Sequence, residues 1–167
     1  VAPEYGGDGK KLASNKYKDP VYGLPAHWAP NDLLFYSGDM FPERYKNGAF
    51  IAFHGSTNRS PYPQAGYVVG FIPFKDGLPS AELEIFADGF AQVDVIKEMK
   101  DAKYRPMGLA EGPDGSLYIS DSKKGKIWRV AYTADKISFT DENLKEMELR
   151  KYLPHIKTPV EFQDIVK

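Results

Sequence analysis

Residues 104–132 read YRPMGLAEGPDGSLYISDSKKGKIWRVAY and contain three short runs of strand-forming residues, at 107–110, 116–120 and 126–131. β-Branched and aromatic residues dominate the last two runs, which favours strands over helices. The runs are separated by Gly-Pro-Asp-Gly at 112–115 and by a polar segment ending in glycine at 122–125. Proline and glycine are the residues that tight turns select. The stretch therefore predicts a small antiparallel meander, the unit of a β-propeller blade.

A second set of strand-forming runs precedes it, at 33–36, 48–54, 67–74 and 83–90. These four runs predict one blade, and the region 104–140 predicts another, with a weaker fourth strand at 136–139. The fold class we expect is therefore all-β, with about two blades of a propeller. Because a closed propeller needs about four to eight blades, the others must come from another chain or from a missing part of the same protein.

The flanking segments differ in composition from the blades. Residues 1–30 combine glycines, lysines and prolines without periodicity and predict an irregular N-terminal loop segment. Residues 31–140 hold the two blades, and residues 141–167 predict a C-terminal helix or linker, with helical spacing over 142–152. The charged segment 92–103 suits a short helix between the blades. The chain opens on valine, and we expect that sequence preceding it was removed.

Composition and charge exclude several classes of function. The 167 residues carry 22 basic and 23 acidic side chains and a formal net charge of −1. This balance gives no electrostatic basis for binding nucleic acid or an anionic membrane. The absence of cysteine excludes disulfides and thiolate metal sites within the chain. No apolar run approaches the roughly eighteen residues that a membrane span requires.

Several motifs in a fixed order resemble the C-terminal part of the glucose/sorbosone dehydrogenase family. They cover roughly residues 20–133 and comprise PAH at 25–27, FYSG at 35–38, FPERY at 41–45, GAFIAFHGSTNR at 48–59, YVV at 67–69, FKDG at 74–77, RPMGL at 105–109 and DGSLYISD at 114–121. The resemblance implies a six-bladed propeller, of which this chain supplies about the last two blades. A second aromatic residue that the family commonly has after His-Gly-Ser is replaced here by Thr57.

The same resemblance implies an activity and its partners. It predicts oxidation of a sugar or related alcohol or aldehyde by pyrroloquinoline quinone, commonly with calcium. It also implies a cytochrome as the electron acceptor, and a periplasmic or secreted location. We expect this chain to be inactive without the N-terminal propeller blades.

Two arginines and a His-Gly pair are the candidate cofactor-binding residues. Pyrroloquinoline quinone carries three carboxylates, and the planar guanidinium of arginine binds a carboxylate through two parallel hydrogen bonds. Arg59 follows one predicted strand and Arg105 precedes another, where loops build the sites of propellers. His54 and Gly55 lie just before Arg59, and glycine permits close backbone approach to a flat ligand. The alternatives are two exposed loop arginines and a plain turn glycine.

The catalytic base is not assigned. Oxidation of an alcohol needs a group that accepts the hydroxyl proton, and histidine suits this role near neutral pH. His54 and His27 are candidates, but the resemblance places the base on an earlier blade, so we expect both first in a pocket wall or a structural role. Asp121 occupies the position of His54 in the second blade, where it caps a turn or lines the channel. No metal ligand is assigned.

Two other functions suit the same pattern. The first is a non-enzymatic propeller that acts as a binding or scaffold module, in which the arginines and histidines are structural. The second is a calcium-dependent lactonase-like propeller, because such enzymes use similar Pro-Asp-Gly blades. The lactonase requires a cage of acidic and amide side chains around calcium, whereas the obvious acids of this sequence lie in turns.

Overall fold

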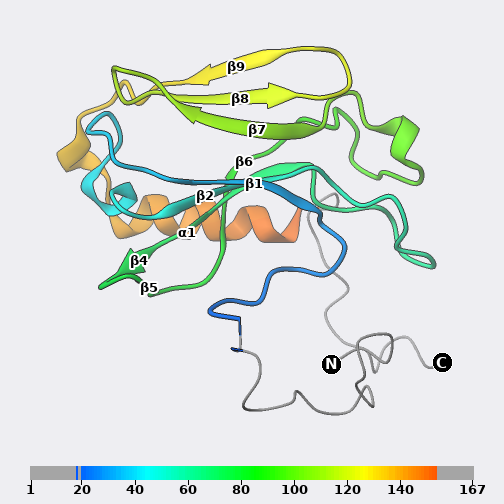
Figure 1. The fold of residues 1–167 in the computed structure, drawn as a ribbon, viewed down its shortest axis with the longest axis horizontal. Coiled ribbons are helices and arrows are strands. Elements are labelled where there is room, and N and C mark those ends of the chain that lie inside the picture. Colours follow the sequence, from blue (N-terminus) through cyan, green and yellow to red (C-terminus); the bar gives the residue numbers. More distant parts are fainter. Residues whose placement is uncertain (1–17, 19, 154–167) are drawn as a thin grey trace.

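Two antiparallel β-sheets stacked face to face form the body of the protein (Figure 1). The computed structural model describes residue 18 and residues 20–153. The four-stranded sheet has the order β1-β2-β3-β6, with β1 at Pro30–Phe35, β2 at Ala49–Phe53, β3 at Val68–Ile72 and β6 at Glu84–Ala87. The three-stranded sheet comprises β7 at Pro106–Glu111, β8 at Leu117–Asp121 and β9 at Ile127–Val130. The prediction of mostly antiparallel β-structure is confirmed.

Smaller elements surround the sheets. A hairpin is formed by β4 at Phe74–Lys75 and β5 at Leu78–Pro79. Helix α1 spans Asp141–Leu149 and lies against β6. Thr140 is its N-cap and forms a capping box with Asn143. Short 3-10 turns are η2 at Glu43–Tyr45, η3 at Met99–Asp101, η4 at Lys136–Ser138 and η5 at Arg150–Tyr152. Helix α1 followed by η5 matches the helix predicted over 142–152.

Two local predictions differ from the structure. The fourth strand predicted at 136–139 is wrong, because η4 occupies this position and the second sheet has three strands. The carboxylate of Asp135 accepts a hydrogen bond from the backbone N–H of Ile137 and so caps the 3-10 turn. In segment 92–103, where a short helix was expected, the structure has the 3-10 turn η3. The predictions for residues 1–17 and 154–167 lie outside the described residues.

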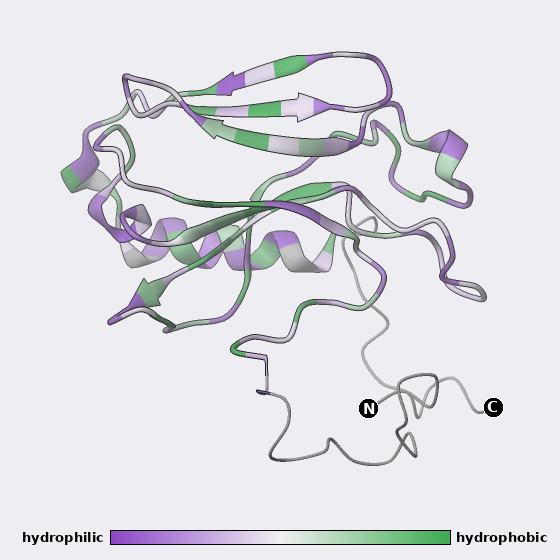
Figure 2. Ribbon diagram, in the orientation of Figure 1, coloured by the Kyte–Doolittle hydropathy of each residue, from purple (hydrophilic) through white to green (hydrophobic). Residues whose placement is uncertain are grey.

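An aromatic core fills the space between the sheets. Strands β2 and β3 are buried along their whole length, and Phe50 and Phe71 point from them toward the second sheet. Their rings lie 4.9 Å apart, and Leu117 and Ile119 of β8 close the core from the other side. Figure 2 shows hydrophobic residues along the central strands of the four-stranded sheet, and hydrophobic bands alternating with hydrophilic ones in the three-stranded sheet and α1. Packing between the sheets therefore fixes their relative position.

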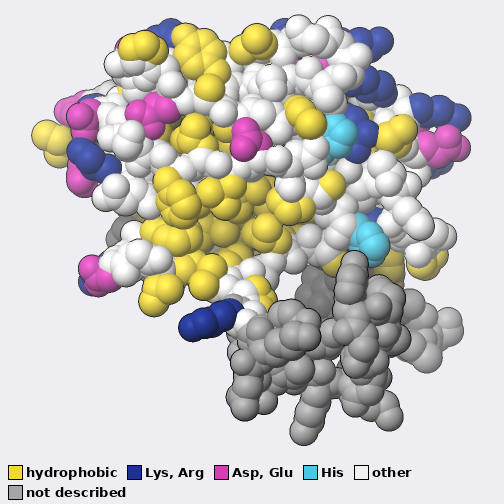
Figure 3. Space-filling view, viewed as in Figure 1, with side chains coloured by type: hydrophobic (Ala, Val, Ile, Leu, Met, Phe, Trp, Pro, Cys, Tyr) yellow, Lys and Arg dark blue, Asp and Glu magenta, His cyan; other side chains and the backbone are white. Residues whose placement is uncertain are grey.

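The opposite face of the four-stranded sheet carries exposed apolar side chains. Leu33 and Phe35 of the edge strand β1 are 52% and 54% exposed, and the Phe35 ring lies 5.0 Å from that of Phe74. Figure 3 shows a broad hydrophobic surface on this side, below β1 and toward the β4–β5 hairpin. The two sheets do not close into a ring, so the described residues form no complete propeller. Between residues 20 and 153, no helix is both long and apolar enough to cross a membrane.

Candidate functional site

The ends of several strands meet at one edge of the stacked sheets. Because β2 runs antiparallel to β3, and β7 to β8, the end of one strand lies beside the start of the next. We call the residues gathered there the strand-end cluster; they are His54, Gly55, Tyr67, Arg105, Asp121 and Ser122. Three of the four predicted cofactor-binding residues and Asp121 are therefore brought together.

Arg105 joins the two sheets in the cluster. Its Nε donates to the carbonyl oxygen of His54 at 2.9 Å, and its Nη2 donates to that of Gly55 at 2.8 Å. The guanidinium carbon lies 5.4 Å from the centre of the Tyr67 ring, a cation–π contact. Burial lowers the pKa of Arg105, whose side chain remains a cation. The sequence suggested that the Arg105 guanidinium binds a cofactor carboxylate. In the structure it binds the two carbonyl oxygens at the end of β2.

Asp121 anchors the backbone beneath Arg105. One carboxylate oxygen accepts the backbone N–H of Arg105 at 2.6 Å, and the other accepts that of Lys124 at 2.5 Å. Burial acts to raise the pKa of Asp121, but these backbone hydrogen bonds outweigh it and hold the pKa below its usual value. Of the two roles left open by the sequence, the structure shows the turn role.

His54 presents a neutral imidazole at this edge. Its Nε2 lies 2.7 Å from Oγ of Ser122, and the tautomer decides which atom donates. Burial, and then the charge of Arg105, lower the pKa of His54 below its ordinary value, although Asp121 acts in the opposite sense. A neutral ring at pH 7 is able to accept a proton. His27 is exposed and takes no part in these hydrogen bonds.

Gly55 and Tyr67 are fitted to one another. Gly55 has φ of +91°, and a Cβ at this position would lie 2.4 Å from the Tyr67 ring, so only glycine is accommodated. Tyr67 itself has φ of +61°, an uncommon conformation for an aromatic residue. Its hydroxyl donates to the carbonyl oxygen of Ser56 at 2.6 Å, and this bond holds the strained residue. Close packing therefore explains the glycine in this structure.

Arg59 lies in the loop that follows the cluster, between β2 and β3. Its side chain is almost buried, with 9% exposure, and burial lowers its pKa. Nη1 donates to the carbonyl oxygen of Pro63 at 3.0 Å, which is the one hydrogen bond of the Arg59 side chain among residues 20–153. A guanidinium has five N–H donors. The buried hydroxyl of the neighbouring Tyr62 also lacks a partner among the described residues. The remaining N–H groups of Arg59 are not among the buried polar atoms without a partner, so they keep access to solvent and to a ligand.

The loop is held in place by buried polar contacts. Oγ of Ser56 donates to Oε1 of Gln64 at 2.7 Å and accepts the backbone N–H of Ala65 at 2.8 Å. The backbone N–H of Gln64 donates to the carbonyl oxygen of Ile96 at 2.7 Å. Arg59 is thus presented by a braced loop, which lowers the entropic cost of binding an acceptor.

No calcium site was found in the described part of the chain. Residues 20–153 contain no group of three or more histidine, cysteine, aspartate or glutamate side chains placed to hold a metal ion. Calcium prefers six to eight oxygen ligands. The described residues therefore supply no cluster of acidic side chains for the calcium that the resemblance implied, or for the cage of the lactonase-like alternative.

Sequence reasoning missed three residues of this region. Ser122, Tyr62 and the positive φ of Tyr67 gave no pattern by which to single them out. Tyr67 resembles any strand-forming aromatic residue, and only the approach of Gly55 reveals its constraint. Ser122 meets His54 across 68 positions of sequence. A contact of this kind depends on the stacking of the sheets and not on any local motif.

A sequence model of the TrAA12-like family matches residues 6–133. An uncharacterized protein of Borreliella burgdorferi is 36% identical over 129 residues. The alignment covers 77% of this chain and 32% of that protein, so the chain spans about a third of the length of this curated relative.

Two solved structures of a carbohydrate-active enzyme of family AA12 from Trichoderma reesei, one described as a calcium structure and one as an iodide structure, also resemble the chain. Each is 24% identical with a TM-score of 0.48, and covers 68% of this chain and 27% of the other. The earlier resemblance to the glucose/sorbosone dehydrogenase family is wrong, because the family model that spans most of the chain is a different one. The chain belongs to the TrAA12-like family.

Proposed function

We propose that this chain forms part of an oxidoreductase that acts on carbohydrates, and that it supplies a cationic contact to a pyrroloquinoline quinone cofactor. Membership of the TrAA12-like family supports the carbohydrate-directed oxidoreductase role. Because the chain spans about a third of its curated relative, the complete reaction involves residues outside it.

One observation carries the cofactor assignment: the Arg59 side chain is 9% exposed and makes one hydrogen bond among the described residues, which leaves its other N–H groups for a ligand. A buried cation with few acceptors is costly, and a carboxylate is the acceptor that a guanidinium binds best. The buried Tyr62 hydroxyl lies in the same loop, has no partner among the described residues and is able to donate to the same ligand. A tricarboxylate such as pyrroloquinoline quinone fits this need. The described residues hold no cluster of acidic side chains, so no calcium ligand is assigned to them.

The remaining residues have positioning roles in this proposal. The bound quinone would supply the acceptor for the hydride removed from a carbohydrate C–H. Arg105 and Asp121 fix the backbone at the end of β2, from which the Arg59 loop extends. His54 provides a neutral imidazole on the same edge, held by Ser122.

The proposal includes partners for the exposed apolar face. Leu33 and Phe35 project from the four-stranded sheet on the side away from the second sheet. We infer that further antiparallel sheets of the intact protein cover this face, and that such sheets complete a propeller. Reduced quinone must be reoxidised, and a cytochrome outside the cytoplasm is the acceptor we propose.

Quinone titration of the intact native protein tests the cofactor assignment. Arg59→Ala should weaken pyrroloquinoline quinone binding at least about tenfold, because a charge-assisted hydrogen bond contributes about 1.5–3 kcal/mol. Arg59→Lys should recover only part of the loss, since lysine keeps the charge without the planar fork. Arg150→Ala removes an exposed arginine and is the matched control. Unchanged binding by Arg59→Ala would refute the assignment.

A further inference from the structure

A pocket separate from the strand-end cluster opens between β6 and the three-stranded sheet. Its volume is about 370 Å³, and its lining includes Asp88, Phe90, Lys103, Tyr104, Lys126 and Trp128. This volume falls within the range of small-molecule sites. The side chains of these residues take no part in the hydrogen bonds of the strand-end cluster or the Arg59 loop, although the carbonyl oxygen of Lys126 accepts the backbone N–H of Asp121 at 2.8 Å. The pocket therefore requires its own explanation.

Three aromatic rings form one wall of the pocket. The Trp128 ring meets Phe90 at 5.0 Å with an interplanar angle of 81°, and meets Tyr104 at 5.2 Å with an angle of 88°. Both contacts are edge-to-face, so each ring restrains the next. Aromatic faces carry negative charge density and attract positively polarised groups, including the C–H bonds of a sugar ring.

Two ammonium groups lie over this wall. Nζ of Lys126 is 5.2 Å from the centre of the Tyr104 ring and 5.6 Å from that of Trp128. Nζ of Lys103 lies 5.4 Å from the Tyr104 ring. The ion pairs found among residues 20–153 include neither lysine. Two cations against the single carboxylate of Asp88 favour a ligand with a negative charge.

We propose that this pocket binds a sugar ring that bears a carboxylate, that is, a uronate. The aromatic wall takes the apolar face of the ring, the two lysines pair with its carboxylate, and Asp88 accepts hydrogen bonds from its hydroxyls. The saccharide part of this assignment rests on the proposed function. The requirement for negative charge rests on the lysines alone.

The test is a titration of the intact native protein with glucuronate, in which NMR monitors the indole N–H resonance of Trp128. Trp28 lies in a second buried cluster, with Ile51 and Phe53, and serves as an internal reference. Glucuronate should shift the Trp128 signal and leave that of Trp28 unchanged. Glucose should bind at least tenfold more weakly than glucuronate, and benzoate should do likewise. Equal or tighter binding of glucose would overturn the anionic class, and equal or tighter binding of benzoate would overturn the sugar class.

Charge variants complete the test. Replacing both lysines, by Lys103→Gln and Lys126→Gln, should weaken glucuronate binding at least tenfold, and exposed side chains of this kind are replaced without loss of folding. Lys75→Gln, on the β4–β5 hairpin, is the matched control and should bind normally. Undiminished binding by the double variant, or no shift of Trp128 in the parent protein, would overturn the site.

These outcomes are independent of the quinone. The Trp128 signal needs neither cofactor nor turnover. If the protein binds glucuronate but not the quinone, the cofactor proposal is refuted and the proposal for the pocket is supported. If quinone binding depends on Arg59 but the Trp128 signal does not shift with glucuronate, only the proposal for the pocket is refuted.

Discussion

At the scale of single residues, two arginines of similar sequence context have different surroundings. Arg105 directly precedes β7 and Arg59 lies in the loop after β2, and both are nearly buried. Arg105 donates to two backbone carbonyls at the end of β2, whereas Arg59 donates to one in its own loop. The sequence indicated that both positions matter. It could not separate them, because the acceptors of Arg105 lie 50 and 51 positions away and are placed only by the stacking of the sheets.

Replacement of Arg105 should destabilise the fold. Arg105→Met removes two hydrogen bonds and leaves the carbonyls of His54 and Gly55 without these donors, so we expect a loss of about 2–4 kcal/mol in the free energy of unfolding. Urea denaturation measures the loss. Arg150→Met, at an exposed position, should change stability by less than about 0.5 kcal/mol. Equal stabilities of the two variants would show that Arg105 is not a structural link.

His54 should make stability depend on pH near neutrality. Its pKa is lower in the folded protein than in the unfolded chain, so the unfolded state binds more protons as pH falls. The stabilising contribution is complete above the unfolded pKa of about 6.5 and is lost as pH falls through the folded value. His54→Gln should therefore flatten the stability profile below about pH 7. Urea midpoints measured across this range check it, and an unchanged profile would contradict the shift.

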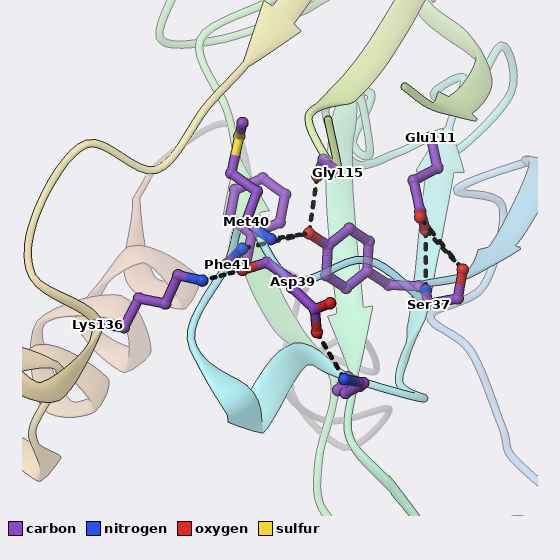
Figure 4. Close-up of polar contacts among 9 residues, drawn as sticks. Ser37, Asp39, Met40, Phe41, Glu111, Gly115 and Lys136 are labelled. Carbon is purple, nitrogen blue, oxygen red and sulfur yellow. Dashed lines mark hydrogen bonds and ion pairs between the residues drawn. The ribbon is translucent and has the colours of Figure 1, made fainter. Parts of the chain in front are cut away.

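At the scale of elements, Tyr36 connects the two sheets at the end of β1. Its buried hydroxyl donates to the carbonyl oxygen of Gly115 at 2.7 Å and accepts the backbone N–H groups of Met40 and Phe41 at 3.0 and 3.2 Å (Figure 4). Beside it, the Glu111 carboxylate accepts the backbone N–H of Ser37 at 2.8 Å. The Pro-Asp-Gly turn therefore also docks one sheet on the other.

Removal of the Tyr36 hydroxyl tests this connection. Tyr36→Phe leaves one buried carbonyl and two buried N–H groups without this partner, so we expect a loss of about 1–3 kcal/mol, seen in the urea midpoint. Tyr152 is 71% exposed, and Tyr152→Phe is the control, with little expected change. A loss no larger than that of the control would mean that the turn docks by other contacts.

Elements with a strong local cause were the ones that the sequence predicted. The turn at 112–115 depends on Gly115, whose φ of +80° favours glycine, and the flanking strands form as expected. The strand at 136–139 failed because the side chain of Asp135 caps a 3-10 turn instead. Short polar segments offer the backbone such local alternatives to sheet pairing. The sequence therefore predicted strands correctly where the run of strand-forming residues was long, and failed where it was short.

At the scale of the whole molecule, the face of the four-stranded sheet that lies away from the second sheet has its own buried cluster around Phe53 but leaves Leu33 and Phe35 of β1 exposed. Leu33→Glu together with Phe35→Glu should lower the thermal midpoint of the intact protein by several degrees, because charges would enter a sheet-to-sheet interface. Ile137, which is 89% exposed, provides the control Ile137→Glu, with a change within about 1 °C. An unshifted midpoint for the double variant would show that no further sheet covers this face.

The family could not be read from the same motifs that revealed the sheets. Strand and turn patterns such as Pro-Asp-Gly followed by Leu117 and Tyr118 arise from turn chemistry and strand propensity, so unrelated blade-like sheets share them. They predicted antiparallel sheets correctly and the wrong family. Only a match across residues 6–133 distinguished the TrAA12-like family.

The central claim is that the intact protein is a quinone-dependent oxidoreductase to which this chain contributes Arg59. The most direct measurement is mass spectrometry of the small molecule released when the purified native protein, saturated with pyrroloquinoline quinone and then freed of excess, is denatured. The claim predicts about one quinone for each chain, together with carbohydrate-dependent dye reduction, and markedly less quinone retained by Arg59→Ala than by Arg150→Ala. Release of no quinone from the parent protein would contradict it.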